Sequence, residues 1–509
     1  MSIQSLVMSK PALATLFMSR AAESVHENGG RRTAARAVEA AIKRTNAYPA
    51  VLIENGVDPE QALRPEMFGE LPLIDKKSYV ERYPLRDRVL DGKLTSAYTI
   101  EKSSGYSGVT NYWLRTPEED ALIPSYMEFA FRQFYRLDLR STLLVMGMAL
   151  GTWTAGMKMS QALREVAATG KYPLTVITPG INLDEILETV RDLSPSYEQT
   201  VIVAYPPFAK LLIDEGIRRG IDWKALNVRL AVGGEGFSEE WRAHLGAKLG
   251  HDTTRDLLAV SSGFGAADLG ASVGREYPAT VLIRQLAAAD TALARDLFGE
   301  GEVPNLFQYS PSGTHIEAVG GQLVFSVVSG IPLVRYAIGD RGGVIPFGKM
   351  ASTLEDHGYD LQARLAELGY ERGDLWRLPF FYCLGRTDGV VFVGGVNVYP
   401  ENVSTALSSL DDPSVLGYKL ATTMADDGFT QRLLVLVEYE AGSLSDAERA
   451  SLAEHYLPAV ADGIARDNAE YRRLREVAPE LAEPVVHVYP TGGGPFAEDV
   501  GKIKRKYVL

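Results

Sequence analysis

"VRLAVGGEGFSEEW", residues 228–241, joins a short apolar run to a helical stretch through two glycines. The run "VRLAV" is typical of a buried strand, and Ser238 is a residue type that caps helices. Four similar apolar runs are "STLLVMG" at 141–147, "LTVIT" at 174–178, "VIVA" at 201–204 and "DLLAV" at 256–260. Amphipathic helical stretches separate these runs. Strands that alternate with helices predict a parallel sheet with helices on its faces, an α/β fold.

Two segments of this α/β region are candidate ligand sites. In open parallel sheets, ligands bind outside the carboxyl ends of the strands. The run "VRLAV" leads into Gly233, Gly234 and Glu235, and "DLLAV" leads into "SSGFGAAD" at 261–268. The sequence therefore predicts a binding site built from these two segments.

Composition excludes several classes of protein. The 509 residues exceed one typical core, so two or more domains are expected. A net charge of −13 argues against a nucleic-acid partner, which needs a broad basic face. Cys383 is the only cysteine, so an intrachain disulfide and a cysteine zinc cluster are both excluded. No apolar run is long enough to span a bilayer and no signal-peptide pattern is present, so we expect a cytoplasmic protein without a membrane partner.

The last 120 or so residues differ in pattern from the α/β region. Strand-like runs occur in "GVVFVGGVNVYP" at 389–400, "RLLVLVEY" at 432–439 and "PVVHVYP" at 484–490. Helices are expected from Pro400 and after Ser445, where Glu448 completes a capping-box spacing. We therefore predict a large domain at 1–385, helical over its first 60 residues, and a small α+β domain at 386–509.

A glycine- and serine-rich stretch, "SSGYSGVT" at 103–110, lies between two strand-like runs. Thr116, Pro117 and Glu119 then form a helix-opening pattern. A Walker phosphate loop requires Lys-Ser/Thr and a helix directly after it, and both are missing. Two interpretations remain open: a nest of amides and hydroxyls that wraps a phosphate, and a plain glycine-rich β-turn.

Six stretches, taken in order, carry a family resemblance. They are "SSGYSGVT" at 103–110, "GGEGFSEEW" at 233–241, "SSGFGAADLG" at 261–270, "PLVRYAIGD" at 332–340, "LGRTDGVVFVGGVNVYPENV" at 384–403 and "GKIKR" at 501–505. Together they resemble the adenylate-forming superfamily of acyl-CoA synthetases, and within it phenylacetate–CoA ligases. "LPLIDKKSYVERYP" at 71–84 adds to the likeness with that branch.

The resemblance implies a two-step reaction and a mobile small domain. A carboxylic acid attacks the α-phosphate of ATP to give an acyl adenylate and pyrophosphate, and a thiol, usually of coenzyme A, then displaces AMP. It also implies the residues of the phosphate loop: Ser103, Ser104, Gly105, Ser107, Gly108 and Thr110. This chain has Tyr106 where the family has a small threonine and Val109 where it has a lysine. Arg115 or Lys102 are candidates to replace the missing charge.

The resemblance assigns further residues to the nucleotide and the metal. Gly234 and Glu235 match the strand end beside adenine; Phe264 and Gly265 match the aromatic motif against adenine; Asp268 matches the magnesium ligand; Asp340 matches the ribose-binding aspartate; Arg386 matches the arginine that contacts ribose and phosphate. Simpler alternatives stay open. Glu235 could be a surface glutamate, Phe264 a core phenylalanine and Asp340 a turn aspartate.

The small domain supplies the last matches. Lys502 in "GKIKR" stands in the place of the catalytic lysine, with Lys504 and Lys506 as alternatives. A solvated basic tail is the simpler interpretation. Asp388 matches the hinge residue. Gly394 and Gly395 match a loop that lines the thiol tunnel, or form an ordinary β-bulge.

These matches predict a ligase that uses ATP, Mg²⁺ and coenzyme A on a small acid, for which an aromatic acid is expected. The stretches 146–160, 203–208 and 261–267 would line the acid pocket, or simply pack in the core. A second hypothesis is an adenylating enzyme whose acceptor is an amine, a carrier-protein thiol or an intramolecular nucleophile. A third is a degenerate nucleotide-binding scaffold. The retention of Asp340, Arg386 and Lys502 argues against it, because a scaffold has no use for a cation on a mobile domain.

Overall fold

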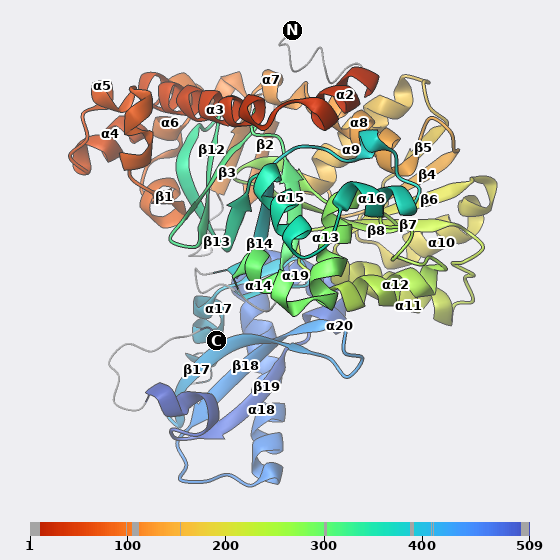
Figure 1. Cartoon of the computed structure of the whole chain (residues 1–509). Helices are drawn as coiled ribbons and strands as arrows, with labels where there is room; N and C mark the ends of the chain where they lie inside the picture. The colour runs from red at the N-terminus through yellow and green to blue at the C-terminus, as the bar shows by residue number, and fades with distance from the viewer. Residues whose placement is uncertain are drawn as a thin grey trace. The chain divides into compact units, whose positions relative to one another are not determined.

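The computed structural model of the chain groups its residues into two compact units (Figure 1). The described residues are 11–97, 99–103, 111–152, 154–299, 303–386, 391–408, 410, 412–499 and 508. The first unit holds the chain up to Gly385 apart from short segments, and the second holds the residues from Arg386 onward. Within these ranges, no helix combines the length and the apolar character needed to cross a membrane.

One twelve-stranded sheet dominates the described part of the first unit. Its strands are β1 (Ile74–Asp75), β4 (Thr142–Gly147), β5 (Leu174–Ile177), β6 (Gln199–Ala204), β7 (Val228–Gly233), β8 (Val260–Ala266), β9 (Gly270–Arg275), β10 (Asn305–Tyr309), β11 (His315–Val319), β12 (Gln322–Val327), β13 (Leu333–Ile345) and β14 (Phe380–Arg386). The order is β11-β12-β13-β14-β10-β9-β8-β7-β6-β4-β5, and β1 pairs with β13. All ladders from β5 to β8 are parallel, so the predicted parallel sheet is confirmed. The ladders that join β8, β9, β10 and β14 are antiparallel.

The strand predicted at 256–260 is wrong in its position. Residues 256–259 form turns and bends, and β8 begins only at Val260. Leu257 and Leu258 are apolar because they pack in a core cluster with the helices after β9, not because they lie in the sheet. The segment "SSGFGAAD", expected to follow the strand, is itself strand up to Ala266. Its small residues allow close pairing with β7, where a Cβ on Gly233 would lie 2.9 Å from the carbonyl oxygen of Gly263.

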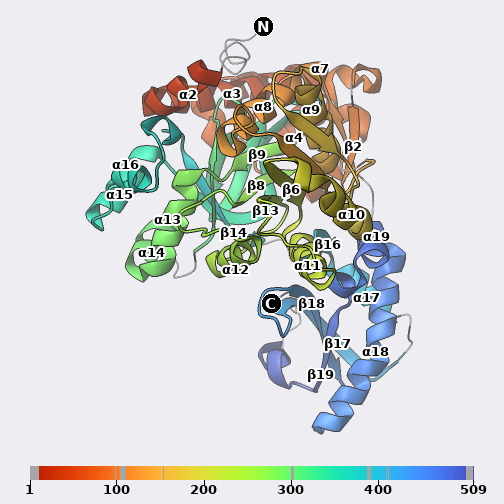
Figure 2. The same ribbon diagram turned by 90° about the vertical axis from the view of Figure 1, so that its right-hand side faces the viewer.

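Helices cover both faces of this sheet. They are α2 (Pro11–Arg20), α3 (Glu23–Arg44), α4 (Ala47–Glu54), α5 (Pro59–Ala62), α6 (Leu85–Arg88), α7 (Pro117–Asp120), α8 (Ile123–Tyr135), α9 (Thr154–Ala168), α10 (Leu183–Leu193), α11 (Pro206–Arg218), α12 (Glu239–Leu249), α13 (Pro278–Ala289), α14 (Thr291–Phe298), α15 (Phe347–Asp356) and α16 (Leu361–Glu367). The helical prediction for the first 60 residues is confirmed from Pro11 onward. Helices α8 and α9 lie beside one another, as Figure 2 shows.

Local capping signals in the sequence form as expected. The Thr116 hydroxyl accepts from the Glu119 amide at the start of α7, and the Glu119 carboxylate accepts from the Thr116 amide at 2.7 Å. The side chain of Asn182 caps α10, and that of Ser238 caps α12. These caps satisfy amides that have no partner inside the helix, which fixes where each helix begins.

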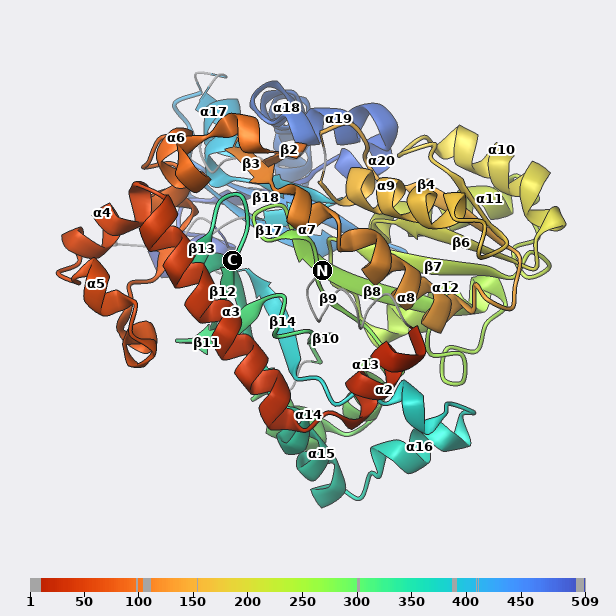
Figure 3. The ribbon, with the colours of Figure 1, turned by 90° about the horizontal axis from the view of Figure 1, so that it is seen from above.

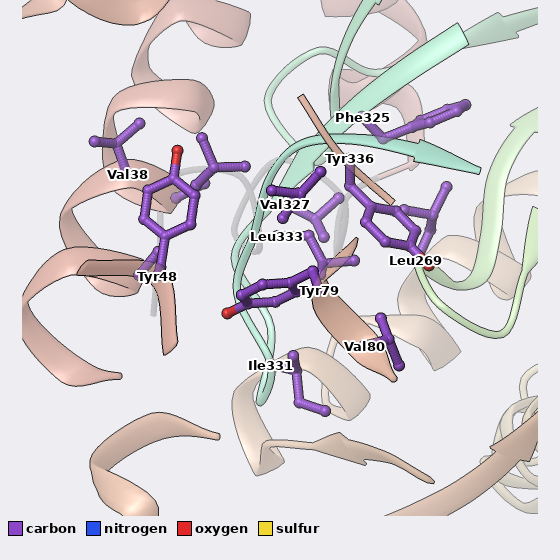
Figure 4. Packing of buried hydrophobic residues seen from close by; sticks show 14 of the residues in the cluster. Val38, Tyr48, Tyr79, Val80, Leu269, Phe325, Val327, Ile331, Leu333 and Tyr336 are labelled. Carbon is purple, nitrogen blue, oxygen red and sulfur yellow. The ribbon is translucent and has the colours of Figure 1, made fainter. Parts of the chain in front are cut away.

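Helix α3 crosses the antiparallel strands β11, β12 and β13, as seen from above in Figure 3. The space between them is filled by an apolar cluster. Figure 4 shows Tyr48, Tyr79, Leu333 and Tyr336 among its members, all fully buried. This packing holds β13, which carries the predicted ribose ligand, against the helical N-terminal segment.

The second unit is α+β, in agreement with the predicted fold class. Its strands are β15 (Val391–Val393), β16 (Val396–Val398), β17 (Val415–Met424), β18 (Gln431–Tyr439) and β19 (Val485–Pro490), and its helices are α17 (Pro400–Ser408), α18 (Asp446–Asp467), α19 (Ala469–Val477) and α20 (Pro479–Ala482). Ser445 and Glu448 form the expected capping box at α18. Strand β17 was not predicted, because its exposed and buried residues do not form one apolar run.

Candidate functional site

The glycine- and serine-rich stretch is flanked by a β-hairpin, as predicted. Strands β2 (Thr99–Ser103) and β3 (Asn111–Arg115) are antiparallel, and Ser103 stands opposite Asn111 at the end nearest the stretch. The indole of Trp113 donates to Ser103 Oγ at 2.8 Å. Ser104, Gly105, Ser107, Gly108 and Thr110, with Tyr106 and Val109, lie outside the described residues. Their assignment to the phosphates stays a prediction.

Arg115 does not supply the missing loop charge, which corrects one expectation. It stands opposite Thr99, at the end of the hairpin away from the loop, about 13 Å along the strand from Asn111. The side chain is buried, and its guanidinium pairs with Glu101 at 3.0 Å and Glu119 at 3.8 Å. Lys102 lies nearer to the loop and is exposed, with its ammonium 5.7 Å from the ring centroid of Tyr112.

Arg115 and its two glutamate partners belong to a buried cluster of charged residues at the base of the hairpin. Lys158 of α9 contributes a second cation, which contacts Glu101 at 3.1 Å and Asp120 at shorter range. Lys158 lies in a stretch predicted to line the acid pocket, but its side chain is committed to these carboxylates. Burial raises the pKa of Glu119, and the Arg115 charge opposes that rise. The cluster joins β2, β3, α7 and α9, and so fixes the base of the hairpin.

The same cluster connects the hairpin to the turn after β8. The Arg115 guanidinium donates to the carbonyl oxygen of Ala267, the residue before Asp268. Asp268 is buried, and its Oδ2 accepts a hydrogen bond of 2.5 Å from the hydroxyl of Tyr336 on β13. Three segments remote in sequence thus meet at the residue predicted to bind magnesium.

Phe264 is a half-buried residue in a cluster of aromatic rings. Its ring centroid lies 5.7 Å from Phe307, 6.2 Å from Phe325 in a stacked arrangement and 5.2 Å from Phe381. These contacts agree with the core-packing alternative. They leave the proposed contact with adenine as a prediction. Gly265, the next residue, is exposed on the other face of β8.

A buried ion network holds the segment that contains Gly234 and Glu235. Glu276 is fully buried between the guanidinium groups of Arg242 at 2.6 Å and Arg284 at 2.7 Å, which also pair with Glu239. Arg284 donates to the carbonyl oxygen of Phe237 at 2.5 Å, and the Ser262 amide donates to Glu276 at 2.7 Å. The network therefore ties the loop after β7 to the first residues of β8.

Gly234 and Glu235 lie within that loop. Gly234 has φ 95°, a backbone conformation that favours glycine whatever the ligand. Glu235 is half-buried. Asp340 is buried in the middle of β13, so the turn-aspartate alternative is wrong, while the ribose role stays a prediction.

Sequence reasoning missed the ion network and its neighbour Arg275. Arg242 and Arg284 lie in helices that read as amphipathic, where charged residues are usually solvated. The one available signal was "GREYP" at 274–278, where two opposite charges stand between a strand and a helix. Arg335 was also missed. It has φ 48° and donates to the carbonyl oxygens of Gly69 at 2.5 Å and Leu71 at 2.6 Å.

Few of the site residues predicted in the second unit are among the residues that the structure describes. Arg386 ends β14, and Asp388, Lys502, Lys504 and Lys506 lie outside the described residues. Gly394 and Gly395 have φ of 60° and 82° and form the two-residue turn between β15 and β16. Positive φ at both positions is the requirement of a tight hairpin turn, so the β-bulge alternative is wrong.

Asp268 is the carboxylate that the resemblance assigns to a divalent cation. Among the described residues, no group of three or more His, Cys, Asp or Glu side chains could hold a metal ion. Mg²⁺ commonly keeps several waters and takes one or two carboxylates together with substrate phosphates. The buried carboxylate of Asp268, which uses Oδ2 for Tyr336, fits that limited role.

The comparisons with known proteins give a likeness in structure. No family model and no curated protein matches the chain. The crystal structure of 2-hydroxyisobutyryl-CoA ligase with 2-HIB-AMP and CoA in the thioesterification state is 12% identical, covers 96% of this chain and 90% of that chain, and has a TM-score of 0.61. The same ligase in the postadenylation state with 2-HIB-AMP is 12% identical over 96% of this chain and 89% of that chain, with a TM-score of 0.50. At such identity the likeness concerns the fold alone, and the chain has the fold of adenylate-forming enzymes.

Proposed function

We propose that the chain activates a small carboxylic acid with ATP as an acyl adenylate and transfers the acyl group to coenzyme A. Residues 1–385 would bind ATP and the acid, and residues 386–509 would form a mobile domain that carries Lys502. The observation that carries the proposal is the order of the six family stretches on a fold shared with an acyl-CoA ligase.

The contacts among these stretches support the proposal. Gly233 pairs with Gly263, which sets the Gly234–Glu235 loop beside Phe264. Asp268 is bonded to Tyr336, four residues before Asp340 on the same strand. Residues for adenine, metal and ribose would therefore lie on segments that contact one another, as a single nucleotide requires.

In the first step, a carboxylate oxygen of the acid attacks the α-phosphorus, an O–P bond forms, and the bond to pyrophosphate breaks. The chain would contribute by holding acid and phosphate in line and by neutralising charge. Asp340 would accept the ribose hydroxyls, and Lys502 would stabilise the phosphate oxygens as charge gathers on them. Mg²⁺, held by Asp268 and the nucleotide, would supply further neutralisation of the phosphates. In the second step the thiol sulfur attacks the acyl carbon, a C–S bond forms, the C–O bond to AMP breaks with its electron pair on AMP, and the thiol proton is released to solvent.

Acid-dependent release of pyrophosphate is the test of the first step. The full chain would be incubated with ATP, Mg²⁺ and single acids, among them benzoate, phenylacetate and 2-hydroxyisobutyrate. We expect release with at least one aromatic acid, and a fall of about 10²–10³-fold in Lys502→Ala. Lys504→Ala is the matched control and should retain the rate. If no acid releases pyrophosphate, the adenylation proposal is wrong.

The acceptor is tested separately from adenylation. With an active acid, we expect AMP release to depend on coenzyme A. AMP release that requires an added amine instead would favour the alternative acceptor class. The altered phosphate loop, with Val109 in place of a lysine, is the feature that keeps this alternative.

A further inference from the structure

Arg275 is an arginine without an acidic partner among the described residues. It ends β9 and is only partly exposed. Its Nη1 is buried and has no hydrogen-bond partner. Its guanidinium carbon lies 5.2 Å from the ring centroid of Phe131, and its charge also acts on the side chains of Tyr135 and Tyr277. A buried guanidinium nitrogen without a partner is costly, and an anion that accepts from it would remove that cost.

The surroundings of Arg275 face the segment predicted to line the acid pocket. Arg275 stands directly opposite Gly263 in the antiparallel β8–β9 pair, so both project from the same face of the sheet. Ser261 shares this face, because side chains two residues apart on a strand point the same way. The hydroxyls of Ser261 and Tyr135 are hydrogen bonded at 3.0 Å. This face of β8 is thus lined by one cation, two hydroxyls and aromatic rings.

Gly263 and Arg275 are both partly exposed on this face. A Cβ built on Gly263 would meet the carbonyl oxygen of Gly274 at 3.8 Å and Nε of Arg275 at 3.9 Å, and no described atom nearer. Both are ordinary van der Waals distances. By contrast, a Cβ on Gly274 of the paired strand would overlap Phe381 at 2.3 Å. A methyl group therefore fits opposite Arg275 without overlap, whereas at Gly274 it does not.

We propose that Arg275 binds a second carboxylate on the acid, and that the enzyme selects acids that carry one. This inference rests on the proposed function and names its substrate class. The planar guanidinium of Arg275 can bind a carboxylate through two parallel hydrogen bonds from adjacent N–H groups. Phe131 and Tyr135 are buried and would hold the guanidinium in place, and the body of a small aromatic diacid would lie beside the partly exposed Gly263.

The reacting carboxylate is a poorer partner for Arg275. It loses its charge when the acyl adenylate forms, and the guanidinium would again be left without an anion. A second carboxylate keeps its charge through both steps of the reaction. Each matched pair of acids, with and without this group, therefore measures the interaction with Arg275.

The experiment compares benzoate with benzene-1,3-dicarboxylate, and phenylacetate with 3-carboxyphenylacetate. Pyrophosphate release gives kcat/KM, and calorimetry without ATP gives the affinity of each acid. In the unmodified protein we expect the diacid of a pair to be favoured about 10- to 100-fold, as for a charge-assisted bond. In Arg275→Met the ratio of kcat/KM within each pair should fall by the same factor. Arg275→Lys keeps the charge without the fork, and the ratio should fall less.

Arg164→Met, which removes an exposed arginine of α9, is the control and should leave the ratio unchanged. The inference is wrong if the unmodified protein shows no preference for the diacid. It is also wrong if Arg275→Met lowers kcat/KM equally for both acids of a pair. Diacid binding that depends on Arg275 without any pyrophosphate release would overturn the proposed function and support the anion site. If Arg275→Met does not fold, the ratio in Arg275→Lys decides the question.

Discussion

Arg275 and Glu276 are adjacent at the end of β9, yet their surroundings are opposite in kind. Glu276 is fully buried, and both of its oxygens contact arginines that are themselves fully buried. Arg275 has no carboxylate among the described residues and leaves one nitrogen unpaired. We call the Glu276 network closed, because each of its charges has an ionic partner. We call Arg275 open, because it has no carboxylate partner among the described residues.

The difference separates charged groups that stabilise the fold from a charged group that is available to bind a ligand. Burying a charge costs several kcal/mol unless a partner and further hydrogen bonds compensate it. In the network of Glu276, Arg242 and Arg284 every charge has an ionic partner, including Arg284 Nε, which lacks a hydrogen bond but lies 3.1 Å from Glu239. Its further hydrogen bonds join Phe237 and Ser262, which belong to the candidate nucleotide segments. Arg275 is partly exposed to solvent, and under our proposal it gains a charged partner when an anionic ligand binds. A closed network has no capacity for a ligand, whereas an open one has.

Glu276→Gln should have the largest effect on stability. The substitution leaves Arg242 and Arg284 with only Glu239 to balance them in a fully buried site. Removing one partner of a buried ion network costs about 3–5 kcal/mol. Chemical denaturation at neutral pH would measure the loss of unfolding free energy. Glu240→Gln, at an exposed position in α12, is the matched control and should change little. An unchanged stability for Glu276→Gln would show that the network does not hold the loop.

Acid should break the same network. Burial alone would raise the pKa of Glu276, but the charges of Arg242 and Arg284 outweigh it and lower the pKa below its ordinary value of 4.5. A carboxyl with a lowered folded pKa contributes its full stabilisation above the unfolded pKa. That contribution is lost as the pH falls through the folded pKa. The unfolding free energy of the unmodified protein should therefore decline below about pH 4.5 more steeply than that of Glu276→Gln. Denaturation curves at pH 7, 5, 4 and 3 would test this, and parallel declines would contradict it.

Asp268 lies between these two cases, because its hydrogen-bond partner is a neutral hydroxyl while its charge also interacts with that of Arg88. Asp268→Asn keeps an acceptor for Tyr336 and removes the charge, so a loss of about 1 kcal/mol in unfolding free energy is expected. If Asp268 holds Mg²⁺, the Mg²⁺ concentration needed for half-maximal pyrophosphate release should rise much more than stability falls. Tyr336→Phe removes the same hydrogen bond and keeps the carboxylate, which makes it the control. A large loss of stability with an unchanged Mg²⁺ requirement would make Asp268 a structural residue.

The sequence predicted what depends on local pattern and missed what depends on distant partners. The parallel strands, the hairpin at 99–115 and the caps at Thr116, Asn182 and Ser445 follow from neighbours within a few residues. The strand at "DLLAV" was misplaced because Leu257 and Leu258 face a helix-side core, and an apolar pair carries no mark of which surface it covers. Arg115 was a candidate for the phosphate because its acids, Glu101 and Glu119, are recognisable as partners only once the hairpin and α7 are folded. The pairing state of Arg275 and Glu276 is likewise a property of the fold.

Arg275→Met should have the smallest effect on stability of these variants, and its contrast with Arg242→Met tests the difference between the two arginines most directly. The substitution removes a cation–π contact worth about 0.5–1 kcal/mol and also removes a buried nitrogen that has no partner. Because the two effects oppose each other, the net change in unfolding free energy should lie within about 0.5 kcal/mol. Arg242→Met removes an arginine of the closed network and should cost several times more. Denaturation of both variants under one set of conditions would measure the contrast. If Arg275→Met destabilised the protein as strongly as Arg242→Met, Arg275 would have a structural partner of its own, and the distinction between a closed and an open network would fail.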